Sequence, residues 1–356
     1  LRIGKKGKEL ASSYSWENTA DSLRQIMQRE LEKHRLEKSS EAKQEGSSVL
    51  NKLFAHYYCW YEEGLGSRHW NDSAVTNVSE CPAEGYYRSY SGDLIEKHIR
   101  QAASAGIDGF IVSMHVAETG VDNIELESLK VLSKKLPPEM SMSVMLCIST
   151  LNSKTLRLAV ALVNELSKSP QYAKGCKGNK SLMCIYLNDY CYHDDVRIVL
   201  DEICRGYDLI FFGQDISSDF WGSELGGIAS GYSLYIPWSI ASADNIGPIL
   251  KRENEFQFTR GIKVRTICPG YDFSHLRDPR RFGAPAMYPV DFSNDRKAEV
   301  LEQELQRVGK RAIDRLTVLT SFNEFHENTH IEPTLENGGR FLEILKSFDK
   351  HSQKED

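Results

Sequence analysis

Two glutamates near the C-terminal end of the chain have the residue type and spacing of an acid/base pair. Glu324 and Glu327 lie three residues apart in the run Asn323-Glu324-Phe325-His326-Glu327. Aromatic neighbours remove water from a carboxyl group, which disfavours its charged form and lets it carry a proton near neutral pH. Two carboxyls in different surroundings can then divide the roles of acid and base, as they do in glycoside hydrolysis. Because paired glutamates are also common on solvated surfaces, their position in the fold decides between the two interpretations.

The segment before this pair is typical of a buried strand. Residues 316–320 are apolar and rich in β-branched side chains, and a polar, aromatic cluster follows them. In parallel α/β proteins the loops at the C-terminal ends of the strands form the active site. Asn323 and His326 belong to this cluster, and we predict that both bind substrate. A histidine held by neighbouring backbone is the alternative for His326.

Eight β-rich runs alternate with amphipathic stretches along the chain. The expected strands are residues 53–60, 109–114, 143–148, 182–187, 209–213, 232–236, 264–268 and 316–322, and the expected helices are residues 93–105, 123–135, 155–167, 195–204 and 296–313. This alternation favours the α/β class and a closed (β/α)8 TIM barrel with right-handed crossovers. An open doubly wound sheet is the alternative, although no glycine-rich phosphate loop follows the first strand.

The expected strand ends carry aromatic and polar side chains that suit a carbohydrate cleft. Aromatic faces stack on sugar rings, while carboxylates and amides bind hydroxyl groups. Any one of these rings can instead be core packing, and an arginine in a charged loop is often solvated. The further candidate substrate-binding residues are Tyr58, Trp60, His115, Asp189, Tyr235, Tyr271 and Arg277.

The composition argues against several classes of partner. A net charge of -6 over 356 residues disfavours nucleic acid or an anionic membrane surface. No apolar run reaches the roughly 18 residues that span a bilayer. The eight cysteines form no CxxC pair, which argues against a zinc ribbon or a thioredoxin-like site. The sequons at Asn71, Asn77 and Asn179 would matter only in a secretory lumen, so the compartment is left open.

Three domains or segments are expected: a helical extension over residues 1–36, a charged and serine-rich linker over 37–50, and the barrel over 51–350. The segments Gly7-Lys8-Glu9-Leu10 and Ser13-Tyr14-Ser15-Trp16-Glu17-Asn18-Thr19-Ala20 resemble the C-terminal tail of retaining glycosyltransferases of the GT-B fold. This resemblance implies an upstream glycosyltransferase domain, and an unrelated amphipathic helix is the alternative. The chain begins with Leu, so we expect a fragment or a processed product.

Several motifs between residue 53 and residue 348 occur in the order and spacing of a known family. They are His56-Tyr57-Tyr58-Cys59-Trp60-Tyr61, Gly85-Tyr86-Tyr87-Arg88-Ser89-Tyr90-Ser91, Ile95-Glu96-Lys97-His98-Ile99, Ala105-Gly106-Ile107-Asp108-Gly109-Phe110-Ile111-Val112-Ser113, Pro269-Gly270-Tyr271, Thr320-Ser321-Phe322-Asn323-Glu324-Phe325-His326-Glu327 and Ile331-Glu332-Pro333. In these motifs the chain resembles glycoside hydrolase family 99, the endo-α-1,2-mannosidases, and their family-99-like relatives.

The resemblance implies a (β/α)8 barrel and retaining cleavage inside α-mannoside chains of an oligosaccharide or polysaccharide. It implies that Glu324 is the base that deprotonates the mannose 2-hydroxyl, which attacks its own anomeric carbon to give a 1,2-anhydro sugar. Glu327 would protonate the leaving sugar and later activate water. No metal or cofactor is expected. A Golgi or secretory location would follow the eukaryotic members of the family, and a cytoplasmic one would follow fusion to a soluble glycosyltransferase.

The chain departs from the family pattern at a few positions. Phe325 stands where the family has Trp, Asn328 where it has Gly, and His330 where it has Gln. Met114-His115 replaces a Trp or Tyr near the sugar on the non-reducing side of the cleaved bond. Besides the endo-α-mannosidase, two hypotheses stay open: a carbohydrate-binding domain that serves a glycosyltransferase, and a barrel glycosidase for another polysaccharide.

Overall fold

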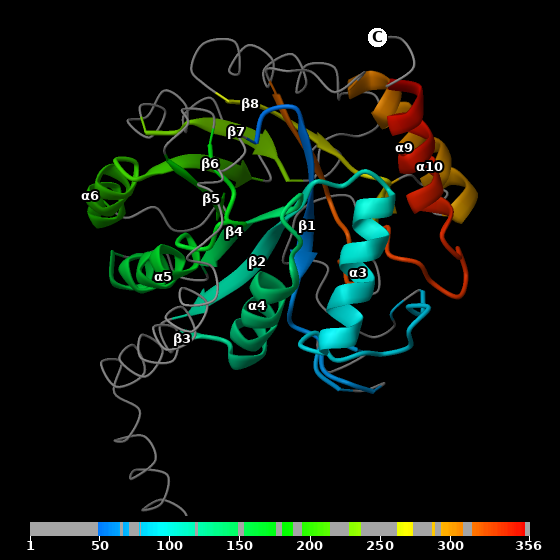
Figure 1. The fold of residues 1–356 in the computed structure, drawn as a ribbon, viewed down its shortest axis with the longest axis horizontal. Helices are drawn as coiled ribbons and strands as arrows, with labels where there is room; N and C mark the ends of the chain where they lie inside the picture. Colours follow the sequence, from blue (N-terminus) through cyan, green and yellow to red (C-terminus); the bar gives the residue numbers. More distant parts are fainter. Residues whose placement is uncertain are drawn as a thin grey trace, which may run out of the picture.

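The apolar, β-rich runs of the sequence pair side by side as parallel strands in the computed structural model. They are β1 (Lys52–Tyr58), β2 (Gly109–Ala117), β4 (Ser141–Ile148), β5 (Ser181–Leu187), β6 (Tyr207–Gly213), β7 (Gly231–Leu234), β8 (Ile262–Ile267) and β11 (Arg315–Leu319). Their order is β1-β11-β8-β7-β6-β5-β4-β2, and β1 also pairs with β2. This last pairing closes the sheet into a ring (Figure 1). The predicted (β/α)8 barrel is confirmed, and the open sheet is excluded.

The structure describes residues 49–64, 67–70, 78, 80–117, 120–148, 153–175, 180–187, 194–213, 228–235, 262–272, 287–288, 293–308 and 315–352. The helical extension predicted for residues 1–36, and the linker predicted for 37–50 except its last two residues, lie outside this part of the chain. Their assignment stays a prediction. No helix in the described ranges is long and apolar enough to cross a membrane.

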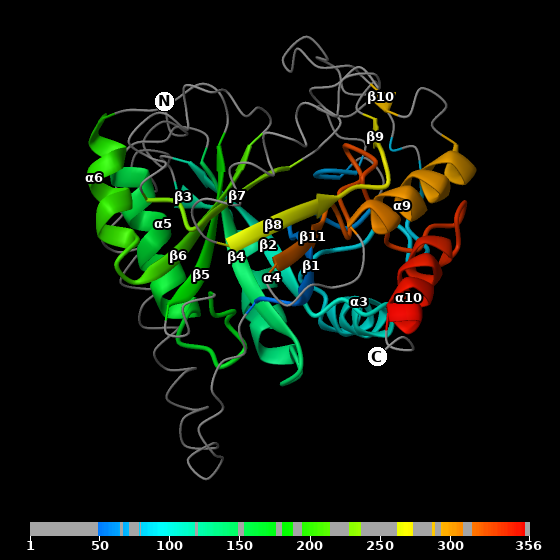
Figure 2. The same ribbon diagram turned by 90° about the horizontal axis from the view of Figure 1, so that it is seen from above.

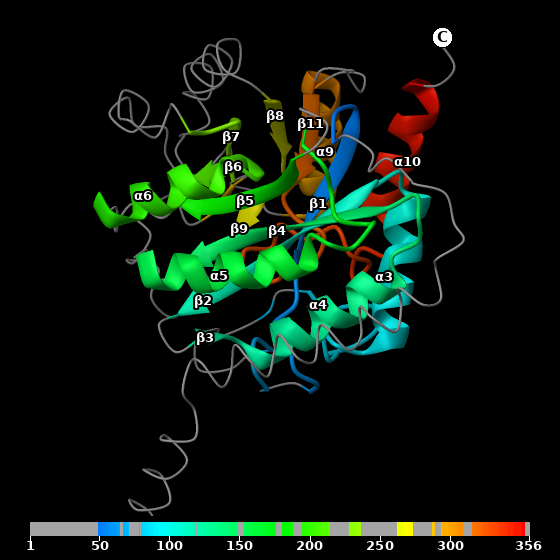
Figure 3. The ribbon, with the colours of Figure 1, turned by 60° about the vertical axis from the view of Figure 1, so that its left-hand side comes forward.

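Amphipathic helices cover the outside of the barrel. Their bounds are α3 (Gly92–Ser104), α4 (Asn123–Lys135), α5 (Ser153–Leu166), α6 (Asp194–Ile203), α9 (Asn294–Val308) and α10 (Arg340–Ser352). Seen from above, α5 and α6 lie on one side of the ring and α9 and α10 on the other (Figure 2). Turned to another side, the same ribbon shows α3, α4 and α5 along the outer face of the strands (Figure 3). The ends of the five predicted helices agree with the observed ends to within two residues, except for residues 309–313 of the last predicted helix, which lie outside the described ranges. Helix α10 was not predicted.

Two predicted strands are shorter in the structure because their ends bind across the barrel mouth. β1 was expected to reach residue 60 and ends at Tyr58, whose N–H donates to the Asn323 side chain at 2.7 Å. β11 was expected to reach residue 322 and ends at Leu319. Beyond it the Phe322 N–H donates to the carbonyl of His56 at 2.8 Å. The segment after β11 therefore crosses over the end of β1, where it can carry a site.

Alternate residues of each strand divide between two cores. On β1, Leu53, Ala55 and Tyr57 pack outward with the helices, while Phe54 and Tyr58 belong to the inner core. This alternation follows from the two-residue period of a strand. Three short strands lie outside the ring: β3 (Gly120–Val121) pairs antiparallel with β2, and β9 (Tyr271–Asp272) pairs with β10 (Met287–Tyr288).

Candidate active site

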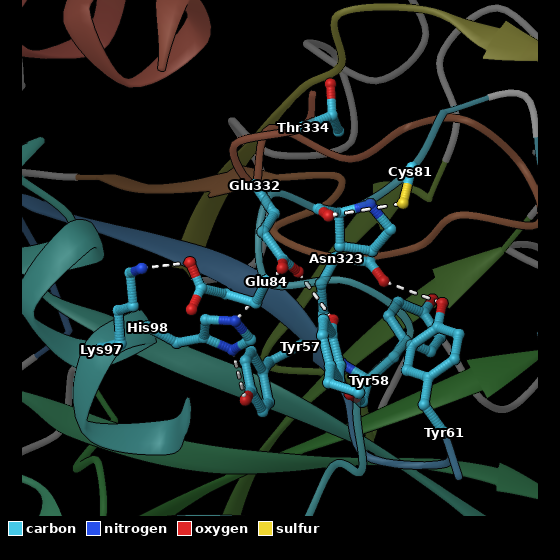
Figure 4. Close-up of polar contacts among 12 residues, drawn as sticks. Tyr57, Tyr58, Tyr61, Cys81, Glu84, Lys97, His98, Asn323, Glu332 and Thr334 are labelled. Atoms are coloured by element: carbon cyan, nitrogen blue, oxygen red, sulfur yellow. Dashed lines mark hydrogen bonds and ion pairs between the residues drawn. The ribbon is translucent and has the colours of Figure 1, made fainter. Parts of the chain in front are cut away.

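The segment from Thr320 to Gly338, here called the glutamate loop, is tied to β1 by one amide side chain. Asn323 accepts a hydrogen bond from the Tyr58 N–H at 2.7 Å and donates to the Tyr58 carbonyl at 2.9 Å. The Tyr61 hydroxyl donates to the Asn323 carbonyl at 2.9 Å and accepts from the Phe325 N–H at 3.1 Å. Asn323 is fully buried and bonded to the residues at the end of β1, so this predicted substrate-binding residue anchors the loop in the structure (Figure 4).

A buried carboxyl ties the loop to the wall formed by β1 and α3. The Tyr87 hydroxyl donates to Glu332 Oε2 at 2.7 Å, and His98 Nε2 lies 3.2 Å from Glu332 Oε1. The other ring nitrogen of His98 bonds the Tyr57 hydroxyl at 2.9 Å (Figure 4). Since Glu332 is almost fully buried, these contacts fix the position of the loop relative to β1 and α3.

A second buried carboxyl, Glu80, ties the loop to α9. It accepts hydrogen bonds from Lys297 at 3.2 Å, Thr334 at 2.7 Å and Asn337 at 2.8 Å. His330 Nε2 lies 3.3 Å from it. Burial raises the pKa of Glu80, but the charge and hydrogen bond of His330, the charge of Lys297 and the hydrogen bond from Thr334 outweigh burial and hold this pKa well below its ordinary value.

Glu324 projects from the loop into a buried environment. Its side chain is 2% exposed, and its Oε1 accepts a hydrogen bond from the His326 N–H at 2.8 Å. Its own N–H donates to Ser321 Oγ at 2.8 Å. Burial raises the pKa of Glu324 well above its ordinary value, and the nearby charge of Glu327 raises it further. The backbone N–H groups of His326 and Glu327 act in the opposite direction because they donate to the carboxylate.

Glu327 lies in the same region. Its backbone carbonyl accepts from the Asp272 N–H at 2.8 Å, and its Oε2 is buried without a hydrogen-bond partner among the described residues. Burial raises the pKa of Glu327 to about 8. After burial itself, the charge of Glu327 is the next cause of the raised pKa values of Tyr235 and Tyr271. Because these tyrosines follow β7 and β8, Glu327 sits among the C-terminal ends of the strands.

Trp60 forms an aromatic wall beside the two glutamates. Three imidazole rings lie against its indole, with centroid distances of 4.7 Å for His69, 4.9 Å for His115 and 5.3 Å for His326. The rings of His69 and His326 are stacked on it. Tyr58 also lies 4.7 Å from Trp60, and its hydroxyl bonds the hydroxyl of Tyr235. These contacts hold the indole in one orientation within a cluster of rings, and aromatic clusters of this kind pack against sugar rings.

His115 is held at the end of β2 by a carboxyl group from α4. Its Nδ1 lies 2.8 Å from Glu125 Oε1, and its N–H donates to Glu125 Oε2 at 2.8 Å. Glu125 is 1% exposed, whereas 47% of the His115 side chain is exposed. The carboxylate fixes the Nδ1–H tautomer, so Nε2 is left to face solvent or a ligand.

The contacts described above bring most of the predicted site residues together at the C-terminal ends of the strands: Tyr58, Trp60, His115, Tyr235, Tyr271, Asn323, Glu324, His326 and Glu327. Asp189 and Arg277 lie outside the described residues. The sequence reasoning missed His69, Glu80, Glu125 and Lys297. Glu125 and Lys297 looked like ordinary charged helix positions, and nothing local marked the loop residues His69 and Glu80. Within the described ranges, no three His, Cys, Asp or Glu side chains are grouped so that they could hold a metal ion.

Comparison with solved structures finds the same fold in glycoside hydrolases. The family GH99 endo-alpha-mannosidase from Bacteroides thetaiotaomicron, in complex with bis-tris-propane, matches with a TM-score of 0.65 at 19% identity, over 85% of this chain and 98% of that one. A glycoside hydrolase-like protein matches with a TM-score of 0.54 at 16% identity, over 87% of this chain and 97% of that one. No protein-family model matches the sequence, and no curated protein matches it. The predicted resemblance to family 99 is thus confirmed at the level of the fold.

Proposed function

We propose that this chain is a retaining, endo-acting α-mannosidase that cleaves internal α-1,2-mannosidic bonds of a glycan. The observation that carries the proposal is that Glu324 and Glu327 share one buried region at the C-terminal mouth of the barrel, each raising the pKa of surrounding groups. The likeness of the fold to a family 99 endo-alpha-mannosidase supports the substrate class. The stacked wall around Trp60 supports a sugar ligand.

The two glutamates divide the first step between them. Glu324 takes the proton of the mannose 2-hydroxyl as this oxygen attacks the anomeric carbon of the same sugar. Glu327 gives its proton to the glycosidic oxygen, so the bond to the leaving sugar breaks and a 1,2-anhydro sugar remains. This is a substrate-assisted form of the two-carboxylate mechanism, in which neither glutamate becomes covalently attached.

The second step returns each proton to its starting place. Glu327, now a carboxylate, takes a proton from water, and the water oxygen attacks the anomeric carbon. The bond from this carbon to the 2-oxygen breaks, and Glu324 gives its proton back to that oxygen. Two inversions at one carbon give net retention of configuration.

The surroundings of the two carboxyls favour this division of roles. Backbone N–H groups that donate to the Glu324 carboxylate partly offset the rise in its pKa that burial causes, and this supports Glu324 as the base. Glu327 has a buried oxygen without a partner among the described residues, which favours the protonated form of a general acid. A pKa of about 8 keeps Glu327 largely protonated at neutral pH.

The test is digestion of a panel of α-linked mannooligosaccharides, with the product anomer identified by NMR at early times. We expect cleavage inside the chain with release of the α-anomer. Glu327→Gln and Glu324→Gln should each lower kcat by roughly 10²–10⁴-fold, while Glu343→Gln on the exposed face of α10 should leave it unchanged. Binding without cleavage of any member of the panel, or an active Glu327→Gln variant, would contradict the proposal.

A further inference from the structure

His326 lies between the backbone of another loop and the carboxyl of Glu324. Its Nε2 is 3.1 Å from the carbonyl oxygen of His69. Its Nδ1 is 3.7 Å from Glu324 Oε1, which is the same oxygen that accepts the His326 N–H at 2.8 Å. One carboxylate oxygen therefore faces both the backbone and the ring of His326.

The carbonyl of His69 determines which ring nitrogen of His326 carries a proton. A carbonyl oxygen only accepts hydrogen bonds, so Nε2 must be the donor. In a neutral imidazole, Nδ1 would then present a lone pair to the Glu324 carboxylate, and the two would repel each other. The contact is favourable when Nδ1 is also protonated, which makes the ring a cation beside the carboxylate.

The His69 carbonyl is held firmly enough to select this state. The next residue, Trp70, is fully buried, stacks on Tyr61 at 4.1 Å and donates from its indole nitrogen to the Tyr87 carbonyl at 2.8 Å. The His69 ring itself is stacked on Trp60 with an interplanar angle of 13°. Since His326 is stacked on the same indole, its ring has little freedom to turn away from the carbonyl.

We propose that His326 is a positioning residue that acts through Glu324: its doubly protonated ring, held by the His69 carbonyl, keeps Glu324 in the carboxylate form. Burial acts against ionisation of Glu324, a second carboxylate at Glu327 would act against it further, and an uncharged Glu324–Glu327 pair would leave no base for the 2-hydroxyl proton. An adjacent cation resolves this conflict, because it stabilises Glu324 as carboxylate while Glu327 keeps its proton. The catalytic consequence rests on the proposed function, whereas the ionisation state of Glu324 does not.

Other titratable groups face this pair, and the test must separate their effects. Besides Glu327 on the loop itself, they are His69 and Tyr61 from the segment after β1, His115 at the end of β2, Cys147 at the end of β4, Tyr235 after β7 and Tyr271 after β8. Burial raises the pKa of each tyrosine and of Cys147, so these four groups stay neutral near pH 7. The imidazoles of His69 and His115 are the groups that call for a control.

The experiment measures the titration of Glu324 directly, by ¹³C NMR of glutamate labelled at the side-chain carboxyl, with Glu324→Gln used to assign the signal. His326→Phe keeps an aromatic ring for Trp60 and removes both nitrogens. We expect the Glu324 midpoint to rise by about one pH unit or more, as for loss of an opposite charge within 4–6 Å. His69→Asn, which tolerates the positive φ of 64° at that residue and keeps its carbonyl, should leave the midpoint within a few tenths of a unit.

The kinetic readout separates this role from a merely structural one. In His326→Phe the acidic limb of kcat/KM should move to higher pH together with the NMR midpoint, with KM nearly unchanged and activity partly recovered as the pH rises toward the pKa of Glu327, about 8. A uniform loss at every pH, or an unchanged Glu324 midpoint, would overturn the proposal. If the wild-type protein cleaves no glycan, the proposed function fails while the NMR titration still decides the role of His326.

Discussion

Two groups of buried carboxyls, Glu80 and the pair Glu324–Glu327, lie at the glutamate loop and have pKa values shifted in opposite directions. Glu80 accepts hydrogen bonds from a lysine, a hydroxyl and an amide and lies beside a histidine, and its pKa is lowered. Glu324 accepts a backbone N–H, Glu327 has a buried oxygen without a hydrogen-bond partner among the described residues, and both carboxyls have raised pKa values. Burial is common to both groups, so the partners decide whether a buried carboxyl holds a structure together or is available to exchange protons.

Removing the cation that pairs with Glu80 should make this carboxyl resemble Glu324 and Glu327, whose pKa values are raised. Lys297→Met would leave Glu80 buried without its fully buried ammonium partner. We expect a loss of about 3–5 kcal/mol in the free energy of unfolding, the usual cost of an uncompensated buried charge. Urea unfolding measures this loss. The matched control is Arg296→Met, an exposed neighbour on the same helix, which should cost less than about 0.5 kcal/mol. Equal costs for the two variants would contradict the comparison.

The raised pKa of Glu327 should lower the free energy of unfolding as pH rises. Glu327 has an ordinary pKa of 4.5 and a folded value of about 8, so between these values the folded state holds a proton that the unfolded state has lost. Stability therefore falls with rising pH in this window, by about 1.4 kcal/mol per unit from this group alone. Glu327→Gln should remove that slope while it lowers kcat by roughly 10²–10⁴-fold. Parallel stability curves for the two proteins between pH 5 and 8 would argue against a raised pKa.

The Glu80 side should show the opposite dependence. Its folded pKa lies below the ordinary 4.5, so its contribution is present above that pH and is lost as the pH falls below it. Glu80→Gln should be less stable than the wild type at pH 7, and the difference should shrink progressively below about pH 4.5. Thermal unfolding at pH 3, 4, 5 and 7 measures it. A pH-independent difference would mean that the hydrogen bonds, and not the charge, hold the loop.

The His115 ring pairs with the buried carboxyl of Glu125 at the mouth of the barrel. His115→Ala removes the ring partner of a carboxyl that is 1% exposed, so stability should fall by about 1–3 kcal/mol. If the exposed ring also binds sugar, KM should rise roughly 3–10-fold with kcat less affected, as expected for the loss of one hydrogen bond. Steady-state kinetics on one cleaved oligosaccharide checks this. An unchanged KM would restrict His115 to the wall around Trp60.

The smallest effect on the free energy of unfolding is expected at Asn328, in the glutamate loop between Glu327 and His330. Asn328 has φ 52°, and its side-chain amide donates to the Asp272 carbonyl at 3.1 Å. Glycine and asparagine are the residues that adopt this conformation readily. Asn328→Ala should therefore cost about 1 kcal/mol, and Asn328→Gly less than that, both measured by urea unfolding. An alanine variant as stable as the glycine variant would show that the backbone relaxes.

Two of the departures from the family pattern face each other in the structure. Phe325 and His330 are both fully buried and stack at 4.1 Å with an interplanar angle of 20°. His330 also lies 3.3 Å from Glu80, so the altered pair adjoins the buried contacts of that carboxyl. Together with Asn328 at its left-handed position, these changes affect packing behind the glutamates. They leave Glu324 and Glu327 unchanged.

Most of the barrel could be predicted because its signals are local. Each of the eight strands is an apolar run, and the amphipathic period marks most of the helices between them. The strand ends were less accurate, because Asn323 and His56 stop β1 and β11 through contacts between residues about 265 apart in sequence. Helix α10 was missed although Phe341, Leu342 and Leu345 are buried at helical spacing.

By itself the sequence determined the fold and the candidate pair, since strand periodicity and the spacing of Glu324 and Glu327 are properties of neighbouring residues. Only the tertiary structure decided the state of each carboxyl. A pKa depends on burial and on charges a few ångströms away, and these come from β1, α4, α9 and the segment after β1, far along the chain. His69 shows this most clearly: a loop carbonyl with no sequence signal selects the protonated ring nitrogen of His326, and through it bears on Glu324.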